Sequence, residues 1–119
     1  VRTLVGTGLF DFGDRDGSFR DALLQHTQAV AIDGNLIYIA DTYNNKVKVL
    51  DMNSKIVSTV AGTGKRGKND GHVHEATFNE PGGIAVIEDS LYVADTNNHA
   101  IRVVSLRNRT VSTLCVETT

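Results

Sequence analysis

The sequence repeats itself once, and this repetition constrains the fold more than any other feature of the chain. The phrase YIADTYNNKVKV, which ends at Val49, returns as YVADTNNHAIRV, which ends at Val103, at a constant offset of 54 residues. Among the 45 aligned pairs that begin at Asp16 and end at Val60, 13 are identical and most others are chemically similar. A fixed period indicates an architecture built from repeated units.

Each repeat contains four short apolar runs that are rich in Val, Ile, Tyr and Thr. We expect strands at 29–32, 36–40, 46–50 and 56–61 in the first repeat, and at 83–87, 91–94, 100–106 and 110–116 in the second. Pairs such as Asp-Gly and Asn-Asn separate the runs, which is typical of tight turns between antiparallel strands. No window holds apolar residues at helical spacing over three turns, so the sequence predicts an all-β fold.

Four-stranded units with a period of about 40 to 55 residues are typical of β-propeller blades packed face to face around an axis. The sequence therefore predicts a β-propeller fragment with two four-stranded antiparallel blades and an extra N-terminal outer strand. We expect residues 1–8 to be the outer strand of a preceding blade. Residues 9–61 and 62–119 then form two blades, each with its leading loop, which is the segment before the first strand.

The polarity of the strands predicts their surroundings. The first two strands of each repeat are apolar at nearly every position, as expected for strands covered on both faces. The third strand alternates between charged and apolar residues at Lys46, Val47, Lys48 and Val49, which favours a position nearer the solvent.

Two blades leave two apolar faces uncovered, because each blade packs against two neighbours. The chain is therefore expected to be an excerpt from a longer propeller, with six blades as the favoured parent, since it begins within the repeat pattern. Alternatively, several copies assemble to close the ring.

The segment Phe78 to Leu106, FNEPGGIAVIEDSLYVADTNNHAIRVVSL, resembles a complete NHL repeat. A second copy at 23–51 departs from the pattern, with Thr27 in place of Pro, Ala29 in place of Gly and Asn45 in place of His. With the linking GTG and DG segments, the resemblance covers almost the whole chain and implies the NHL-repeat β-propeller fold. The combination also resembles members of the family in which a thioredoxin-like domain precedes the propeller.

Four residues that recur in both repeats are expected to fasten the turn between the second and third strands: Asp41, Thr42, Asp95 and Thr96. Asp and Thr side chains can accept hydrogen bonds from backbone N–H groups that lack strand partners, and Asn tolerates a positive φ. Because these residues occur in every repeat, we assign them a structural role and no catalytic one.

In a propeller, this turn lies on the same face as the connection between blades, and we expect the binding residues there. Loops on a rigid scaffold are common binding surfaces. The candidates are Tyr43, Asn44, Asn45, Lys65, Arg66, Lys68, His72, His74, Asn97, Asn98 and His99.

Three groups in the loops allow alternative interpretations. His72 and His74, with Glu75 nearby, could chelate a metal, but two imidazoles supply half of a tetrahedral shell, and we expect no metal or other cofactor. The basic cluster Lys65–Lys68 could hold a phosphate backbone, yet the equivalent loop of the first repeat is acidic. The rings Phe10, Phe12 and Phe19 either anchor a partner or, as we favour, plug their own loop onto its blade.

The function indicated is a non-catalytic scaffold that binds a protein or peptide on the loop face. Cys115 lies in an apolar strand run, no Ser lies in a strained Gly-flanked turn, and we identify no catalytic residue. A net charge of −2 gives no general attraction to nucleic acid or anionic lipid, and no run is long enough to span a membrane. The alternatives are the propeller portion of a thiol oxidoreductase or of a metal-dependent lyase and, third, RNA binding. The sequence does not indicate a compartment.

Overall fold

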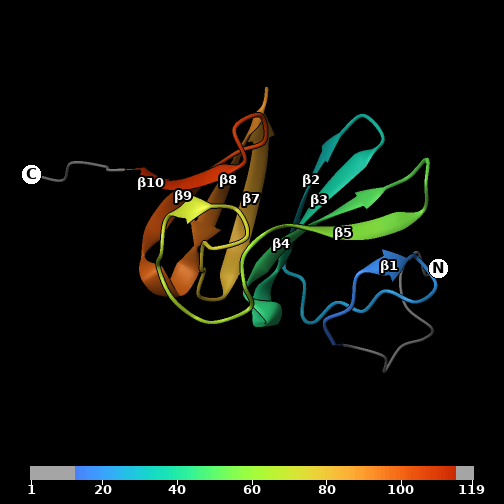
Figure 1. Cartoon of the computed structure of the whole chain (residues 1–119), viewed down its shortest axis with the longest axis horizontal. Coiled ribbons are helices and arrows are strands. Elements are labelled where there is room, and N and C mark those ends of the chain that lie inside the picture. The colour runs from blue at the N-terminus through green and yellow to red at the C-terminus, as the bar shows by residue number, and fades with distance from the viewer. Residues whose placement is uncertain (1–12, 115–119) are drawn as a thin grey trace, which may run out of the picture.

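The computed structural model describes residues 13–114, which form two antiparallel sheets side by side (Figure 1). The main strands of the first sheet are β2 (Ala29–Asp33), β3 (Leu36–Asp41), β4 (Lys46–Asp51) and β5 (Ile56–Ala61). Those of the second are β7 (Pro81–Ile87), β8 (Ser90–Asp95), β9 (Ala100–Ser105) and β10 (Thr110–Leu114). In both sheets, strands adjacent in sequence pair with each other, so the predicted all-β fold with one blade per repeat is confirmed.

Each sheet also contains a fifth strand that the sequence analysis did not anticipate. The leading loop returns to the outer edge of its own blade, where β1 (Gly17–Ser18) pairs with β5 and β6 (Gly71–His72) pairs with β10. The resulting orders are β1-β5-β4-β3-β2 and β6-β10-β9-β8-β7. The outer strand predicted at residues 1–8 lies outside the described residues.

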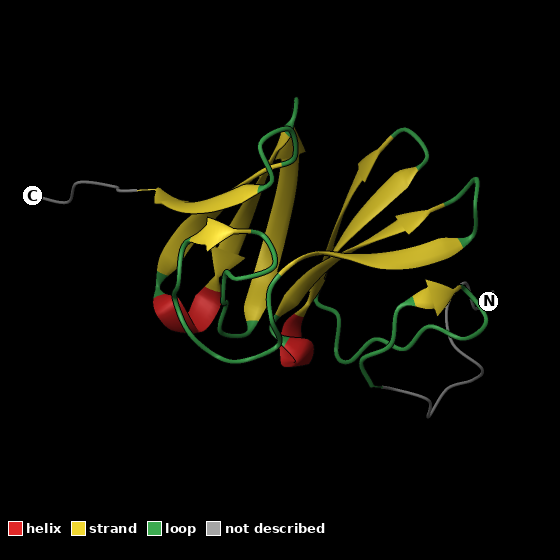
Figure 2. Ribbon diagram, viewed as in Figure 1, coloured by secondary structure: helices red, strands yellow, loops and turns green. Residues whose placement is uncertain are grey.

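The turn between the second and third main strands contains a single 3-10 turn in both sheets, η1 (Thr42–Asn44) and η2 (Thr96–Asn98). Both lie at the same end of the molecule (red in Figure 2), which we call the loop face. The residue that follows is left-handed, with φ of 56° at Asn45 and 52° at His99. Asn and His are both among the non-glycine residues that adopt this conformation most often.

The main apolar core lies between the two sheets. Tyr38 and Val47 of the first sheet belong to the same buried cluster as Leu91, Val93 and Val104 of the second. The first strands β2 and β7 contact each other directly, so they form the inner edge where the sheets approach most closely. The sheets therefore pack face to face, as propeller blades do.

A second cluster lies under the first leading loop, where Phe19 and Ala22 pack with Ile39, Leu50 and Val57. The prediction that Phe19 plugs its loop onto its own blade is confirmed, since this ring is 8% exposed. Phe10, Phe12 and Cys115 lie outside the described residues.

Each sheet also has an uncovered apolar face. Val30 and Ile32 of β2 are 56% and 66% exposed on the outer side of the first sheet, and Ile87 is 59% exposed on the far side of the second. The equivalents of Val30 and Ile32 are Ile84 and Val86, which pack against the interblade core. The first strand is thus covered on both faces only where a neighbouring blade is present.

The expectation that the third strand lies nearer the solvent is wrong. Lys48 in β4 and the equivalent Arg102 in β9 are completely buried. Their charges are tolerated inside the protein because each is surrounded by carboxylates, whose contacts are described below.

Candidate functional site

The repeated aspartates tie the leading loop to the turn in which they occur. Asp41 Oδ1 accepts a hydrogen bond from the backbone N–H of Gln25 at 2.8 Å, and Asp95 Oδ1 accepts one from Asn79 N–H at the same distance. Neither aspartate caps its 3-10 turn. The backbone donors to Asp41 and Asp95 lie 16 residues upstream and not within the turn, while the Asn side chain of each turn donates to the other carboxylate oxygen.

The repeated asparagines complete the same anchor. Asn44 Nδ2 donates to Asp41 Oδ2 at 2.8 Å and to the carbonyl of Gly13 at 2.6 Å. Asn98 Nδ2 donates equivalently to Asp95 Oδ2 and to the carbonyl of Gly67, both at 2.7 Å. These two binding candidates use their amide groups within the fold.

Two further residues of η1 and its cap connect the blades. Thr42 Oγ1 donates to the carbonyl of Pro81 at 2.7 Å. Asn45 accepts from the N–H of Glu80 at 2.8 Å and donates to the carbonyl of Gly64 at 3.2 Å. Thr42 and Asn45 are buried, so they act in blade packing and not in binding.

Their equivalents in the second repeat are exposed. Thr96 Oγ1 donates only to the carbonyl of Ala94 at 3.4 Å, and His99 lies on the surface. Thr42 and Asn45 face the second sheet. Thr96 and His99 lie on the equivalent side of the second sheet, where they are exposed.

Lys48 is held by carboxylates from the leading loop and from β3. Its Nζ lies 2.7 Å from Asp14 Oδ1, 3.3 Å from Asp16 Oδ1 and 3.6 Å from Asp41 Oδ2. Burial opposes the charge of Lys48, but the hydrogen bond and charge of Asp14, followed by the charges of Asp41 and Asp16, raise its pKa overall. Burial raises the pKa of Asp41, and the hydrogen bonds from Gln25 and Asn44 offset that effect only in part.

Arg102 forms the equivalent cluster in the second repeat, although its buried Nε has no hydrogen-bond partner among the residues described. Nη1 donates to Asp95 Oδ2 at 2.8 Å and to the carbonyl of Thr77 at 2.7 Å. Nη2 donates to Asp70 Oδ1 at 2.7 Å and to the carbonyl of Asn69 at 2.8 Å. Burial opposes ionisation of Asp70, yet the hydrogen bonds from Arg102 and Thr113 lower its pKa. Both cation clusters tie the leading loop to its blade.

The side chains that differ between the repeats form a separate group on the loop face. His26 and Tyr43 in the first repeat contact each other with ring centroids 4.3 Å apart. The equivalent pair in the second repeat is Glu80 and Asn97, in which Asn97 Nδ2 donates to Glu80 Oε2 at 2.6 Å. The structure thus assigns His26 and Glu80 to the site, although the sequence analysis overlooked both.

A signal for this pair was present in the sequence. His26 and Glu80 are equivalent positions at which the repeats differ, immediately before the first strand. Both have a left-handed backbone, with φ of 53° and 52°, which non-glycine residues adopt at a cost. The backbone conformation, however, emerges only from the structure.

The remaining candidates are divided between two places. Lys65 and Arg66 are exposed on the part of the second leading loop that runs from Gly64, beside Asn45, to Gly67, beside Asn98, and the exposed Lys68 follows directly. This part therefore lies on the loop face with Tyr43 and Asn97.

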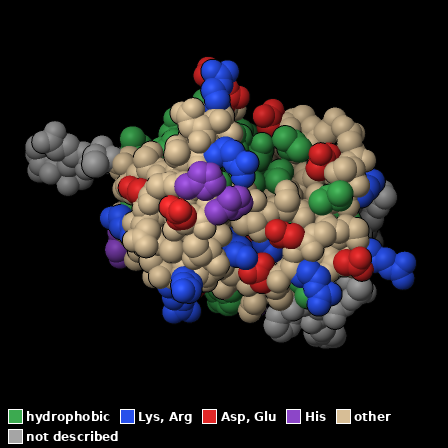
Figure 3. Space-filling model, in the orientation of Figure 1, with side chains coloured by type: hydrophobic (Ala, Val, Ile, Leu, Met, Phe, Trp, Pro, Cys, Tyr) green, Lys and Arg blue, Asp and Glu red, His purple; other side chains and the backbone are tan. Residues whose placement is uncertain are grey.

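The prediction that His72 and His74 lie on the loop face is wrong. His72 pairs with Thr110 at the start of β10, and His74 Nε2 lies 3.0 Å from Arg109 Nη2. The leading loop has turned away from the loop face toward the outer edge of the second sheet by this point, because β6 continues the sheet there. On this side of the molecule, histidine side chains lie beside basic and apolar ones (Figure 3).

The two histidines are engaged with protein groups. His72 Nδ1 accepts from the backbone N–H of His74 at 3.2 Å. His74 Nε2 accepts from Arg109, because a guanidinium group can only donate. Within residues 13–114 no three His, Cys, Asp or Glu side chains are grouped as metal ligands. That stretch also contains no helix of the length and apolarity required to cross a membrane.

Two stacked antiparallel meanders, repeated at a fixed offset and anchored by the same Asp–Asn–cation contacts, define a β-propeller domain. Comparison with known proteins gives the family. The NHL repeat family matches residues 78–104, and the LVIVD repeat family matches residues 25–54.

The chain is 48% identical to NHL repeat-containing protein 2 of Bos taurus, over 94% of this chain and 17% of that protein. It is 52% identical to Protein SUPPRESSOR OF QUENCHING 1, chloroplastic, of Arabidopsis thaliana, over 82% of this chain and 10% of that protein. A structural genomics protein of unknown function from Bacteroides thetaiotaomicron superposes with a TM-score of 0.70 at 29% identity, over 84% of this chain and 24% of that one. This chain belongs to the NHL-repeat family, and it spans less than a fifth of these two sequence relatives.

Proposed function

We propose that this chain is part of a non-catalytic scaffold that binds a protein or peptide on its loop face. The observation that carries the proposal is that some loop-face residues form hydrogen bonds within the fold while others are exposed. Asn44, Asn45 and Asn98 form hydrogen bonds within the fold. Tyr43 and Asn97, which differ between the repeats, are exposed on the same face. A rigid scaffold with variable exposed side chains is typical of a binding surface.

The chemistry at the centre of this face suits a basic side chain. Tyr43 lies in the turn whose Thr42 and Asn45 bind the backbone of Pro81 and Glu80, so Tyr43 and Glu80 belong to neighbouring segments of the loop face. An aromatic ring and a carboxylate on the same face favour a Lys or Arg side chain through cation–π attraction and an ion pair. Farther out, Lys65, Arg66 and Lys68 suit acidic groups of the same partner.

The backbone that carries the Glu80 side chain is fixed by its surroundings. The left-handed conformations of His26 and Glu80 cost about 1–3 kcal/mol each, and the same conformation occurs at Lys55, Glu88 and Arg109 in the strand-connecting turns. The Glu80 backbone is held in place by Asn45, which accepts its N–H. The surrounding structure therefore presents the Glu80 side chain at a defined position.

The test is binding of the intact protein to an array of short synthetic peptides. We expect selection of peptides that contain Lys or Arg, and Glu80→Gln and Tyr43→Ala should each reduce the signal by about tenfold, since each removes one contact of a charged group. Asn53→Ala, an exposed change in the β4–β5 turn on the opposite side, serves as the matched control. Peptide signals that neither site variant changes would contradict the proposal.

RNA binding remains a prediction for the basic part of the same face. It differs in its salt dependence, because phosphate contacts release counterions and weaken steeply with added salt. A partner whose binding falls steeply with salt and requires Lys65, Arg66 and Lys68, but not Glu80, would identify nucleic acid in place of a peptide.

A further inference from the structure

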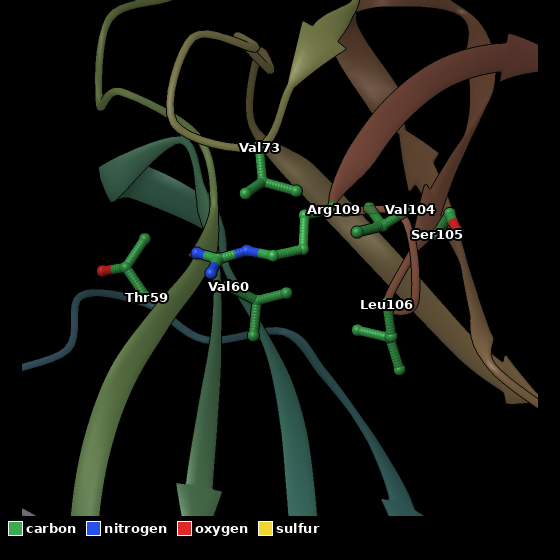
Figure 4. A pocket seen from close by; sticks show the side chains of 7 residues that line it. All are labelled: Thr59, Val60, Val73, Val104, Ser105, Leu106 and Arg109. Atoms are coloured by element: carbon green, nitrogen blue, oxygen red, sulfur yellow. The ribbon is translucent and has the colours of Figure 1, made fainter.

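A cavity of about 150 Å³ lies between the two sheets, at the outer edge and away from the loop face. Its walls come from β5, the second leading loop, β9 and the β9–β10 turn (Figure 4). The lining residues are Thr59, Val60, Val73, Val104, Ser105, Leu106 and Arg109. Four of these residues are aliphatic, and a cavity of this size accommodates a group as large as a benzene ring.

Arg109 carries the only charge in the lining. Its side chain extends between Val73 and Val60, with the guanidinium end toward Thr59 (Figure 4). Its partner is the ring of His74, at 3.0 Å. No carboxylate within the described part of the chain pairs with Arg109, whereas Arg107 in the same turn pairs with Asp89 at 3.6 Å. The cavity therefore has an apolar wall and a cation without a counter-ion.

The first repeat shows what fits at the equivalent position. Val73 corresponds to Phe19, whose ring is buried in the second apolar cluster with Leu50 and Val57. Arg109 corresponds to Lys55, whose Nζ lies 5.9 Å from the centroid of the Phe19 ring. An aromatic ring beneath a cation is thus built into the first repeat, while the second repeat retains the cation and has the smaller Val side chain.

We propose that this cavity binds a small aromatic carboxylate. The ring takes the place that Phe19 fills in the first repeat and packs against Val73, Val104 and Leu106. The carboxylate pairs with the guanidinium of Arg109, a geometry that permits two parallel hydrogen bonds. This site is independent of the loop face, so it neither requires nor supports the function proposed above.

The experiment measures binding of 3-phenylpropionate to the intact protein by saturation-transfer NMR and titration calorimetry. We expect binding in the millimolar range, as is usual for a ligand of this size. The neutral amide 3-phenylpropionamide should bind at least about tenfold more weakly, because it lacks the charge that Arg109 recognises. Arg109→Ala should weaken binding of the acid by a similar factor. Arg107→Ala, in the same turn, should leave it unchanged.

The decisive variant is Val73→Phe, which copies the first repeat and fills the cavity from within. We expect it to abolish binding and to leave the unfolding midpoint at or above that of the unchanged protein. If the midpoint falls, Leu106→Phe provides a second way to fill the same space from the opposite wall. Binding that survives a folded filling variant, or equal affinity for the acid and the amide, would overturn the proposal.

Discussion

The two repeats occupy equivalent places in the fold but bury their polar groups differently. The buried cation of the first repeat is Lys48, whose partners Asp14 and Asp16 are partly exposed. The second uses Arg102, which binds two carboxylates and two backbone carbonyls. The 3-10 turns also differ, since Thr42 and Asn45 of the first repeat are buried while the equivalent Thr96 and His99 of the second are exposed. Identical positions in a repeat therefore contribute unequally, according to what covers them.

The largest expected effect is on the free energy of unfolding when the buried cations Arg102 and Lys48 are replaced. Arg102→Met leaves Asp95 fully buried without its cation, which should lower the free energy of unfolding by about 3–5 kcal/mol. Lys48→Met should cost less, because Lys48 Nζ lies 3.6 Å from the buried Asp41, whereas Arg102 Nη1 lies 2.8 Å from Asp95. Urea unfolding of the intact protein measures both. An equal or larger loss for Lys48→Met would show that the closer contact of Arg102 with its buried carboxylate does not distinguish the clusters.

The blade-connecting asparagine gives the next effect. Asn45→Ala removes the acceptor of Glu80 N–H and the donor to the Gly64 carbonyl, at an expected cost of about 1–3 kcal/mol. Asn53→Ala, an exposed asparagine in the same repeat, should change stability by less than about 0.5 kcal/mol. The same unfolding assay compares the two variants, and similar small losses would remove Asn45 from the blade contact.

A smaller effect tests whether a further blade covers the second sheet. Thr42→Val removes the hydrogen bond to the Pro81 carbonyl, which we expect to cost about 1 kcal/mol. In the intact protein, where we propose that the next blade packs beside η2, Thr96→Val should cost a similar amount. Chemical denaturation of both variants measures the difference. No cost at Thr96 would mean that its hydroxyl has no interblade acceptor.

The smallest effect concerns acid stability. The pKa of Asp70 is lowered in the folded protein, so its stabilising contribution is present above the unfolded pKa of about 4 and is lost as the pH falls through the folded value. Asp70→Asn should therefore flatten the decline of stability on acidification. The raised pKa of Asp41 has the opposite sign, so its cost is relieved at low pH and Asp41→Asn should steepen that decline. Denaturation midpoints between about pH 3 and 6 report the slopes, and equal slopes would contradict the assigned directions.

Much of the fold could be predicted from local patterns. The 54-residue offset and the four apolar runs correctly predicted the main strands and their order, because side-chain alternation and turn residues are local properties. The extra edge strands β1 and β6 could not be predicted, since each contains two residues and forms only where the leading loop meets the fourth strand.

The candidate site was predicted less well. Tyr43 and Asn97 do lie on the loop face, but Asn44 and Asn98 have their amides engaged within the fold. His72 and His74 lie elsewhere, because a loop that leaves one face of a blade can return along its edge. Sequence position alone does not reveal that path.

What the sequence by itself determined is the repeat, the strand pattern and the family, because these depend on residue types at short, regular spacing. Only the tertiary structure decided which copy of a residue is buried, where Lys48 finds its carboxylates, and why replacing Phe19 by Val73 coincides with a cavity. Those outcomes depend on contacts between segments far apart in the chain, and a repeated sequence cannot specify them because its two copies have different neighbours.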